Sequence, residues 1–286
     1  MTEMSAWQIP WTWPVFIIVP VVVTATLFAI GTARQKARVS ARSVSCFVAG
    51  IIALVLALDS PIHELSEELF WAHMMQHEIL MLVAAPLFVV SRPMVAFVWA
   101  IPKSWRARVG SVTKWHCFQD GWLAISAPGV AWLLHALALW LWHAPRLFVA
   151  ALDSEALHAA QHISFFATAL LFWWTLVHHH GRKLGYGGAL LYVFTTMVHT
   201  SVLGAWLTFS ASPWYYPYIK AASRWNLTAI EDQQIGGLIM WVPGGVLLTL
   251  VMLAIFLKWL EQSEQRWEFT RTADLIRSSA GVAREI

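Results

Sequence analysis

Residues 70–90 read FWAHMMQHEILMLVAAPLFVV. This apolar stretch is long enough to cross a bilayer as one helix, which needs about 20 residues, and it contains two histidines four residues apart, His73 and His77. A second apolar stretch repeats the spacing at His158 and His162. Positions i and i+4 lie on one face of a helix about 6 Å apart, so each pair can offer two imidazoles to one ion. Histidines are unfavourable in hydrocarbon and usually mark a site or pathway there.

The composition indicates an integral membrane protein. Of the 286 residues, 58% are hydrophobic and 12% are charged, whereas soluble domains contain about 25% charged residues. The 19 tryptophans suit the two water–lipid interfaces, where the indole ring is favoured. The two cysteines form no CxxC or CxxCH motif, which argues against a disulfide scaffold and covalent c-type haem. We therefore expect a multi-pass integral membrane protein that contacts the lipid bilayer.

The hydrophobic pattern predicts an all-α bundle of about seven transmembrane helices. We expect residues 1–260 to form one transmembrane domain and residues 261–286 to form a polar cytoplasmic tail. Met94–Ile101 is too short to span and is expected to be interfacial or re-entrant. Pro128-Gly129 and Pro243-Gly244-Gly245 predict breaks within two of the spans. The seven predicted spans are Pro14–Gly31, Val44–Asp59, Phe70–Val90, Trp122–Trp142, Ala156–Val177, Leu190–Phe209 and Gln234–Trp259.

The placement of the cations predicts the orientation. Sixteen of the 19 Lys and Arg residues fall in the 31–43 and 91–121 loops, just after the fifth span, or in the tail. The other connections contain only Arg146, Lys220 and Arg224. By the positive-inside rule, the N-terminus is outside and the C-terminus is cytoplasmic. This distribution accounts for the basic pI near 9.0, so no nucleic-acid partner is expected.

The predicted topology brings polar residues of several spans to the outer half of the membrane. His73 and His158 lie near the outer ends of their spans, and His77 and His162 lie one turn deeper, about 6 Å. We predict a metal site whose candidate ligands are His73, His77, His143, His158, His162 and Asp232. Deeper polar residues, expected to support the site, are Glu78, His135 and His199.

Isolated histidines have simpler interpretations. His63 lies in an acidic outer loop and is expected to be solvated, and His178-His179-His180 suits the negative end of a helix dipole. The paired histidines differ, because an imidazole without a partner costs a few kcal/mol to desolvate. A shared ion or a shared hydrogen-bond network would remove that cost. Imidazole suits Zn, Cu, Fe and Ni alike, so the residues alone leave the metal open.

The same residues carry a resemblance to a known family. The chain resembles the polytopic CtaG family of cytochrome c oxidase assembly factors, from the third predicted span to the seventh. The resemblance implies a seven-span, multi-pass protein of the bacterial cell (inner) membrane that helps a haem–copper oxidase mature, by supplying or holding copper, with oxidase subunits as partners. It also implies roles for the motif residues His73, His77, Glu78, His143, His158, His162 and Asp232. The family often has Glu before the second histidine of the 158–162 pair, where this chain has Gln161. The matching segments are residues 73–87, 141–145, 156–165, 172–174 and 232–241.

Two other functions fit the residues. A membrane b-type cytochrome would bind haem between one histidine of each pair, and a metal transporter would use His135 and His199 along a path. An enzyme is not expected, since no nucleophile–base pairing or phosphate loop is evident. The sequence His73-Met-Met-Gln-His77 also lacks the glutamate of a zinc-protease HExxH motif.

Overall fold

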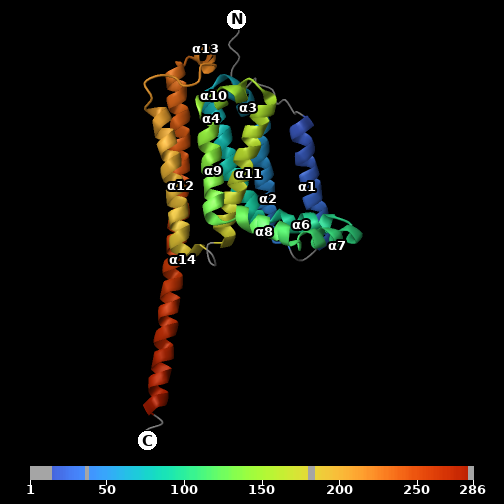
Figure 1. The fold of residues 1–286 in the computed structure, drawn as a ribbon, viewed down its shortest axis with the longest axis vertical. Helices are drawn as coiled ribbons and strands as arrows, with labels where there is room; N and C mark the ends of the chain where they lie inside the picture. The colour runs from blue at the N-terminus through green and yellow to red at the C-terminus, as the bar shows by residue number, and fades with distance from the viewer. Residues whose placement is uncertain (1–14, 36–38, 180–183, 283–286) are drawn as a thin grey trace.

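A bundle of long helices forms the body of the protein (Figure 1). The computed structural model describes residues 15–35, 39–179 and 184–282, and these residues contain helices and no strand. The elements are α1 Val15–Gln35, α2 Ala41–Asp59, α3 Pro61–Glu68, α4 Phe70–Glu78, the π-helical η2 Ile79–Ala84, α5 Ala85–Ser91, α6 Pro93–Ala100, α7 Lys103–Val112, α8 His116–Ile125, α9 Pro128–Trp142, α10 Pro145–Leu152, α11 Glu155–His179, α12 Gly185–Thr208, α13 Tyr218–Ala221, the 3₁₀-helical η4 Ala222–Trp225 and α14 Ala229–Val282.

Six segments of the described chain are long and apolar enough to cross a membrane. Each overlaps one of the predicted spans. The observed ends differ from the predicted ends by several residues at most, except where the second and the last segments continue into polar residues. The third predicted span is continuous from Phe70 to Ser91, through α4, η2 and α5. The short second span continues from α2 into α3 and reaches Glu68. The structure therefore supports an all-helical membrane protein with about six candidate spans.

The fourth predicted span differs from the prediction. Residues 122–142 do not form one straight helix, because α8 and α9 meet at an angle of 63°. Pro128 begins α9, and the preceding Ala127 is extended with ψ 135°. Proline disfavours the helical conformation of the residue before it, which favours a break at Ala127. A seventh span exists only if α8 and α9 are counted together.

The predicted break at Pro243-Gly244-Gly245 is wrong, because α14 runs without interruption from Ala229 to Val282. Proline inside a transmembrane helix removes one backbone hydrogen bond, but neighbouring groups in the bundle can compensate for it. The helix also passes from the apolar part of the chain into the polar residues from Glu261 onward. In Figure 1 this polar part projects well beyond the bundle.

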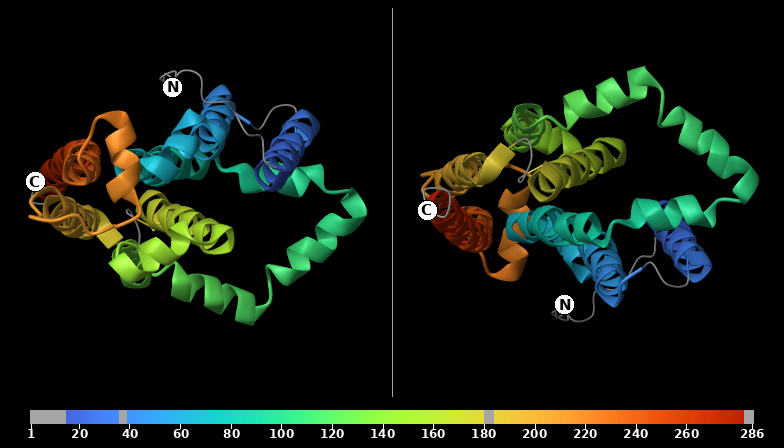
Figure 2. Two further views of the ribbon diagram at one scale, coloured as in Figure 1. Left: turned by 90° about the horizontal axis from the view of Figure 1, so that it is seen from above. Right: turned by 90° about the horizontal axis from the view of Figure 1, so that it is seen from below.

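Three short helices lie at the end of the bundle from which α14 projects, and they extend to one side of it. Figure 2 shows α6, α7 and α8 following a wide arc that connects α5 with α9. The predicted short segment, Met94–Ile101, corresponds to α6, which packs on α1 where Gly31 meets the backbone of Ala96. Trp105 and Trp115 on this arc are more than half exposed, as expected for residues at an interface.

The two ends of the bundle differ in charge. The arc contains Arg92, Lys103, Arg106, Arg108 and Lys114, and it lies at the end from which α14 projects (Figure 1). The opposite end contains α3, α10 and α13, with the connections that contain Arg146, Lys220 and Arg224. The described cations thus divide between the ends as the predicted orientation requires.

Glycines allow the last two long helices to pack closely. A Cβ on Gly237 of α14 would lie 2.7 Å from the carbonyl oxygen of Gly204 on α12, which is closer than real Cβ atoms approach. Gly236 faces the ring of Phe70 on α4 in the same way. Small residues at helix contacts are typical of membrane bundles, where backbones approach closely. These contacts hold α14 against both α12 and α4.

Candidate metal centre

Five of the six predicted ligands meet at the end of the bundle opposite the α14 extension. His73 and His77 project from α4, His158 and His162 from α11, and His143 ends α9. All except His158 are less than 9% exposed. Neighbouring imidazole centroids lie 4.4–6.0 Å apart along the series His158, His162, His73, His77 and His143.

Three of these histidines form the tightest group. His73, His158 and His162 each offer a ring nitrogen, and the three nitrogens lie within 4.8 Å of one another. Their ring centroids are 5.2, 5.9 and 4.4 Å apart. Three imidazoles arranged in a plane around one ion would have centroids about 5.4 Å apart, for metal–nitrogen bonds of about 2.0 Å. The triad of His73, His158 and His162 therefore has the dimensions of a three-imidazole metal site.

Each of the five histidines has a buried Nε2 atom without a hydrogen-bond partner among the described residues. Nε2 of His73, His143, His158 and His162, and both ring nitrogens of His77, are buried with no hydrogen-bond partner among the described residues. Buried polar atoms are normally paired, and each exception needs an explanation. Five such imidazoles in one place form a candidate ligand-binding site.

Hydrogen bonds to the other ring nitrogen set the tautomer of two histidines. Nδ1 of His143 lies 2.7 Å from the carbonyl oxygen of Leu139. Because a carbonyl only accepts, Nδ1 carries the proton and the lone pair is on Nε2. Nδ1 of His73 lies 3.4 Å from the hydroxyl of Tyr218. This hydroxyl donates to the carbonyl of Ser66 at 2.9 Å, so its oxygen can accept from His73. Such bonds orient metal-binding histidines and expose Nε2.

Two tyrosines that the sequence analysis did not single out cover the cluster. Tyr218 lies beside His73, and Tyr215 donates to the carbonyl oxygen of His143 at 2.8 Å. Burial raises the pKa of both phenols above the ordinary value of 10.0, so each hydroxyl keeps its proton and can donate. Both come from the connection between α12 and α14, where aromatic residues crowd residues 214–218. That aromatic run is the sequence signal that could have identified them.

The expectation that His63 is simply solvated is wrong. His63 on α3 is half-buried, and its ring stacks at 6.0 Å on that of His158. The amide nitrogen of Gln76 lies 3.1 Å from Nδ1 of His63 and donates to the carbonyl of Ala57 at 2.6 Å. With Nδ1 accepting, the proton of a neutral His63 lies on Nε2. His63 thus borders the cluster at its less buried side.

Asp232 holds the helix that carries the first histidine pair. Its two carboxylate oxygens accept hydrogen bonds from the backbone N–H groups of Phe70, at 2.8 Å, and Trp71, at 3.0 Å. These are unpaired donors at the start of α4, and an Asp in this position caps a helix. The side chain is fully buried. This arrangement favours a positioning role for Asp232 over direct metal binding.

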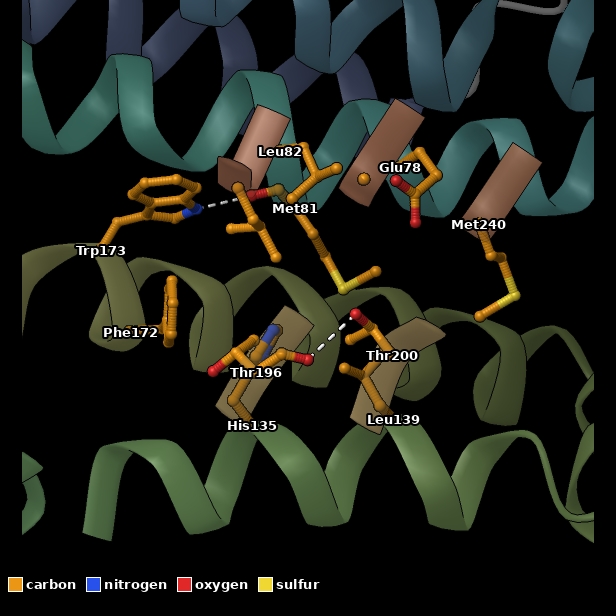
Figure 3. Close-up of a pocket in the computed structure, with 12 residues that line it drawn as sticks. Glu78, Met81, Leu82, His135, Leu139, Phe172, Trp173, Thr196, Thr200 and Met240 are labelled. Atoms are coloured by element: carbon orange, nitrogen blue, oxygen red, sulfur yellow. Dashed lines mark hydrogen bonds between the residues drawn. The ribbon is translucent and has the colours of Figure 1, made fainter. Parts of the chain in front are cut away.

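Glu78 faces away from the cluster into a separate cavity of about 30 Å³. Figure 3 shows its carboxylate beside the same space as His135, Thr196 and Thr200. Oε2 of Glu78 is buried without a hydrogen-bond partner among the described residues. A space of this size has room for water, since a water molecule needs a cavity of at least about 10–15 Å³. Glu78 and His135 therefore share a second polar region deeper in the bundle.

The π-helical stretch η2 forms one wall of that cavity. Within it, the carbonyl of Met81 accepts a hydrogen bond from Nε1 of Trp173 at 2.8 Å (Figure 3). Such π-helical turns are often found at functional sites. His199 does not line the cavity; its ring lies 5.4 Å from that of Trp132 on α9. At the opposite end of α11, His178 stacks on Trp174 at 3.9 Å, and His180 lies outside the described residues.

Comparison with known proteins identifies the family. The model of the cytochrome c oxidase caa3 assembly factor family matches residues 26–262. The chain belongs to this family. That match covers all five clustered histidines and Asp232, so the candidate metal centre lies within the family domain. The coarser prediction, a cytochrome c oxidase assembly factor, is confirmed at the level of the family.

Two relatives of this family member are uncharacterized proteins of Mycobacterium bovis and Mycobacterium tuberculosis. Each is 24% identical over 257 residues, which is 85% of this chain. The chain spans only 38% of the length of these two proteins. No solved structure matches the chain.

Proposed function

We propose that this membrane protein binds copper through the clustered histidines and supplies it to a cytochrome c oxidase during assembly. The observation that carries the proposal is the convergence of three ring nitrogens, from His73, His158 and His162, within 4.8 Å. Imidazole is a good ligand for copper. The proposed acceptor is a cytochrome c oxidase because the chain belongs to a family of assembly factors for the caa3 type of this enzyme.

The surroundings of the cluster support binding followed by release. Neutral imidazoles contribute no charge, so the bound ion keeps its own charge and can be drawn to a more strongly binding acceptor. Tyr218 and Leu139 hold His73 and His143 with Nε2 unprotonated, so copper does not have to displace a proton there. His158 is the least buried of the five histidines, so an ion would reach an oxidase subunit at this end of the bundle most directly past its side chain.

The haem alternative finds less support. A haem iron bound by two histidines requires a flat macrocycle between the two rings. The rings of His73 and His158 instead stack at 5.2 Å, and the rings of His77 and Phe165 are in direct contact at 4.6 Å. Purified protein with a Soret band would nevertheless reverse this preference.

Metal analysis of the purified full-length chain tests the binding step. We expect copper to co-purify or to be retained after loading, and His77→Ala/His162→Ala to lose it while remaining in the membrane. His178→Ala, which removes a histidine at the opposite end of α11, is the matched control and should retain copper. Full copper retention in the double variant would contradict the proposal.

The oxidase itself provides the second test. Cells that lack the protein should contain oxidase subunits with little copper and little activity, and added copper should partly restore both. A His162→Ala variant should reproduce this deficiency, whereas His178→Ala should not. An oxidase with full copper content and normal turnover in the deletion strain would contradict the assembly role and favour the transporter or cytochrome alternatives.

A further inference from the structure

Two imidazoles of the cluster lie outside the group whose ring nitrogens converge most tightly. The triad of His73, His158 and His162 satisfies three ring nitrogens around one centre. His77 and His143 lie outside this triad, and both have a buried Nε2 without a hydrogen-bond partner among the described residues. Two imidazoles left unpaired beside a complete three-ligand site require a separate explanation.

The geometry of this second pair is that of a linear site. The ring centroids of His77 and His143 lie 6.0 Å apart, with planes at 80°. Two imidazoles that bind one ion in a line have centroids about 6 Å apart, since each metal–nitrogen bond is about 2.0 Å and each nitrogen lies about 1.1 Å from its ring centre. Linear coordination leaves the two rings free to rotate about the axis, so crossed planes are acceptable.

The walls around the pair limit which ion can bind. Phe165 packs on both rings, at 4.6 Å from His77 and 5.9 Å from His143, and Phe148 lies 6.3 Å from His143. Zn²⁺ usually takes four ligands in proteins, and these two phenylalanines offer none. The other imidazoles near His77 are those of His73, at 4.5 Å, and His162, at 5.3 Å, and both belong to the triad. Cu(I) is stable with two nitrogen ligands, and its single charge costs less to desolvate than a double charge.

We propose that His77 and His143 bind a second copper ion, as two-coordinate Cu(I), next to the ion held by His73, His158 and His162. This inference rests on the proposed copper function and adds a stoichiometry of two ions per chain. His143 is fixed for this role, because its Nδ1 donates to Leu139 and its Nε2 is the free ligand atom.

Repulsion between the ions sets the order of binding. Two unit charges about 5 Å apart in a protein environment repel strongly enough to weaken the second binding event about 100-fold. The triad supplies three ligands and the pair supplies two, so the triad fills first. The His77–His143 ion is therefore the more easily released of the two.

The test is an anaerobic titration of the detergent-purified full chain with Cu(I), in competition with a chromogenic chelator. The unchanged protein should bind two ions, the second about 100-fold more weakly, and X-ray absorption should show the edge feature of linear Cu(I) only as the second ion binds. His143→Asn keeps a donor for the carbonyl of Leu139 but lacks Nε2, so it should bind one ion and lose that feature. His199→Asn, which changes a half-buried histidine outside the cluster, is the control and should bind two.

The outcomes separate this inference from the proposed function. One ion in the unchanged protein, retained in His143→Asn but lost in His158→Ala, would overturn the second site and leave the copper function intact. Loss of all copper in both His143→Asn and His158→Ala would indicate one shared ion and would also overturn it. If the unchanged protein binds no copper, the proposed function itself fails.

Discussion

The carboxylate of Asp232 accepts a hydrogen bond from the backbone N–H of Phe70 at 2.8 Å, which joins the start of α14 to the start of α4. The second oxygen accepts from Trp71 at 3.0 Å. His73 lies one turn further along α4. A residue on one helix thus fixes the position of a candidate ligand on another.

This contact predicts different effects for two substitutions of Asp232. Asp232→Ala removes the cap of α4, which costs about 1–2 kcal/mol, and it should lower both thermal stability and copper content. Asn keeps one accepting oxygen and so can retain one of the two hydrogen bonds, and Asp232→Asn should therefore keep more copper and more stability than Asp232→Ala. Copper loss in Asp232→Asn equal to that in Asp232→Ala, with a normal melting temperature, would instead identify Asp232 as a ligand.

Tyr218 predicts a change in affinity without a change in fold. Tyr218→Phe removes the hydroxyl that lies 3.4 Å from Nδ1 of His73 and donates to Ser66. Loss of a group that orients a metal-binding histidine typically weakens binding 10- to 100-fold, and we expect about a tenfold increase in the copper dissociation constant. Tyr216→Phe is the control, since Tyr216 is 64% exposed. Equal affinities of the two variants would contradict the orienting role.

The histidine cluster could be predicted largely from the sequence, for a physical reason. The i, i+4 spacing fixes two imidazoles on one helix face, and the position along each span fixes their depth. These two local rules are enough to bring His73 and His77 to the level of His158 and His162. Which three nitrogens approach most closely depends on the packing of α4 against α11, and sequence spacing contains no information about that.

The sequence-based predictions are wrong or incomplete where contacts between distant parts of the chain determine the structure. Pro128 and Pro243 have the same Pro–Gly signal, yet one begins a helix after the extended Ala127 and the other lies inside α14. The acidic neighbours of His63 in the chain predict a solvated side chain, but the fold of α3 stacks its ring on that of His158. Tyr218 reaches His73 from 145 residues away, a distance over which no local pattern can be read.

The contact between α12 and α14 predicts a strong effect of one added methyl group. In Gly237→Ala, the new Cβ would lie 2.7 Å from the carbonyl oxygen of Gly204 and 2.5 Å from Oγ1 of Thr208. The helices must separate to accommodate it, and overpacking of this kind typically costs about 1–3 kcal/mol. Thermal unfolding in detergent should show the loss. Gly245→Ala is the matched control on the same helix, because nothing lies within 4 Å of its added Cβ; an equally large loss there would contradict this explanation.

The arrangement of charge predicts which end of the bundle is cytoplasmic. The arc of α6–α8 and the α14 extension share one end and contain most of the described cations, whereas the histidine cluster lies at the other end with α3, α10 and α13 (Figure 1). By the positive-inside rule, the cationic end faces the cytoplasm. A reporter fused after Ile286 should therefore behave as cytoplasmic, and one inserted near Asp153, at the end of α10, should behave as external. Alkaline phosphatase requires an oxidising compartment for its disulfides, so high activity of a C-terminal phosphatase fusion would reverse the orientation and move the histidine cluster to the cytoplasmic side.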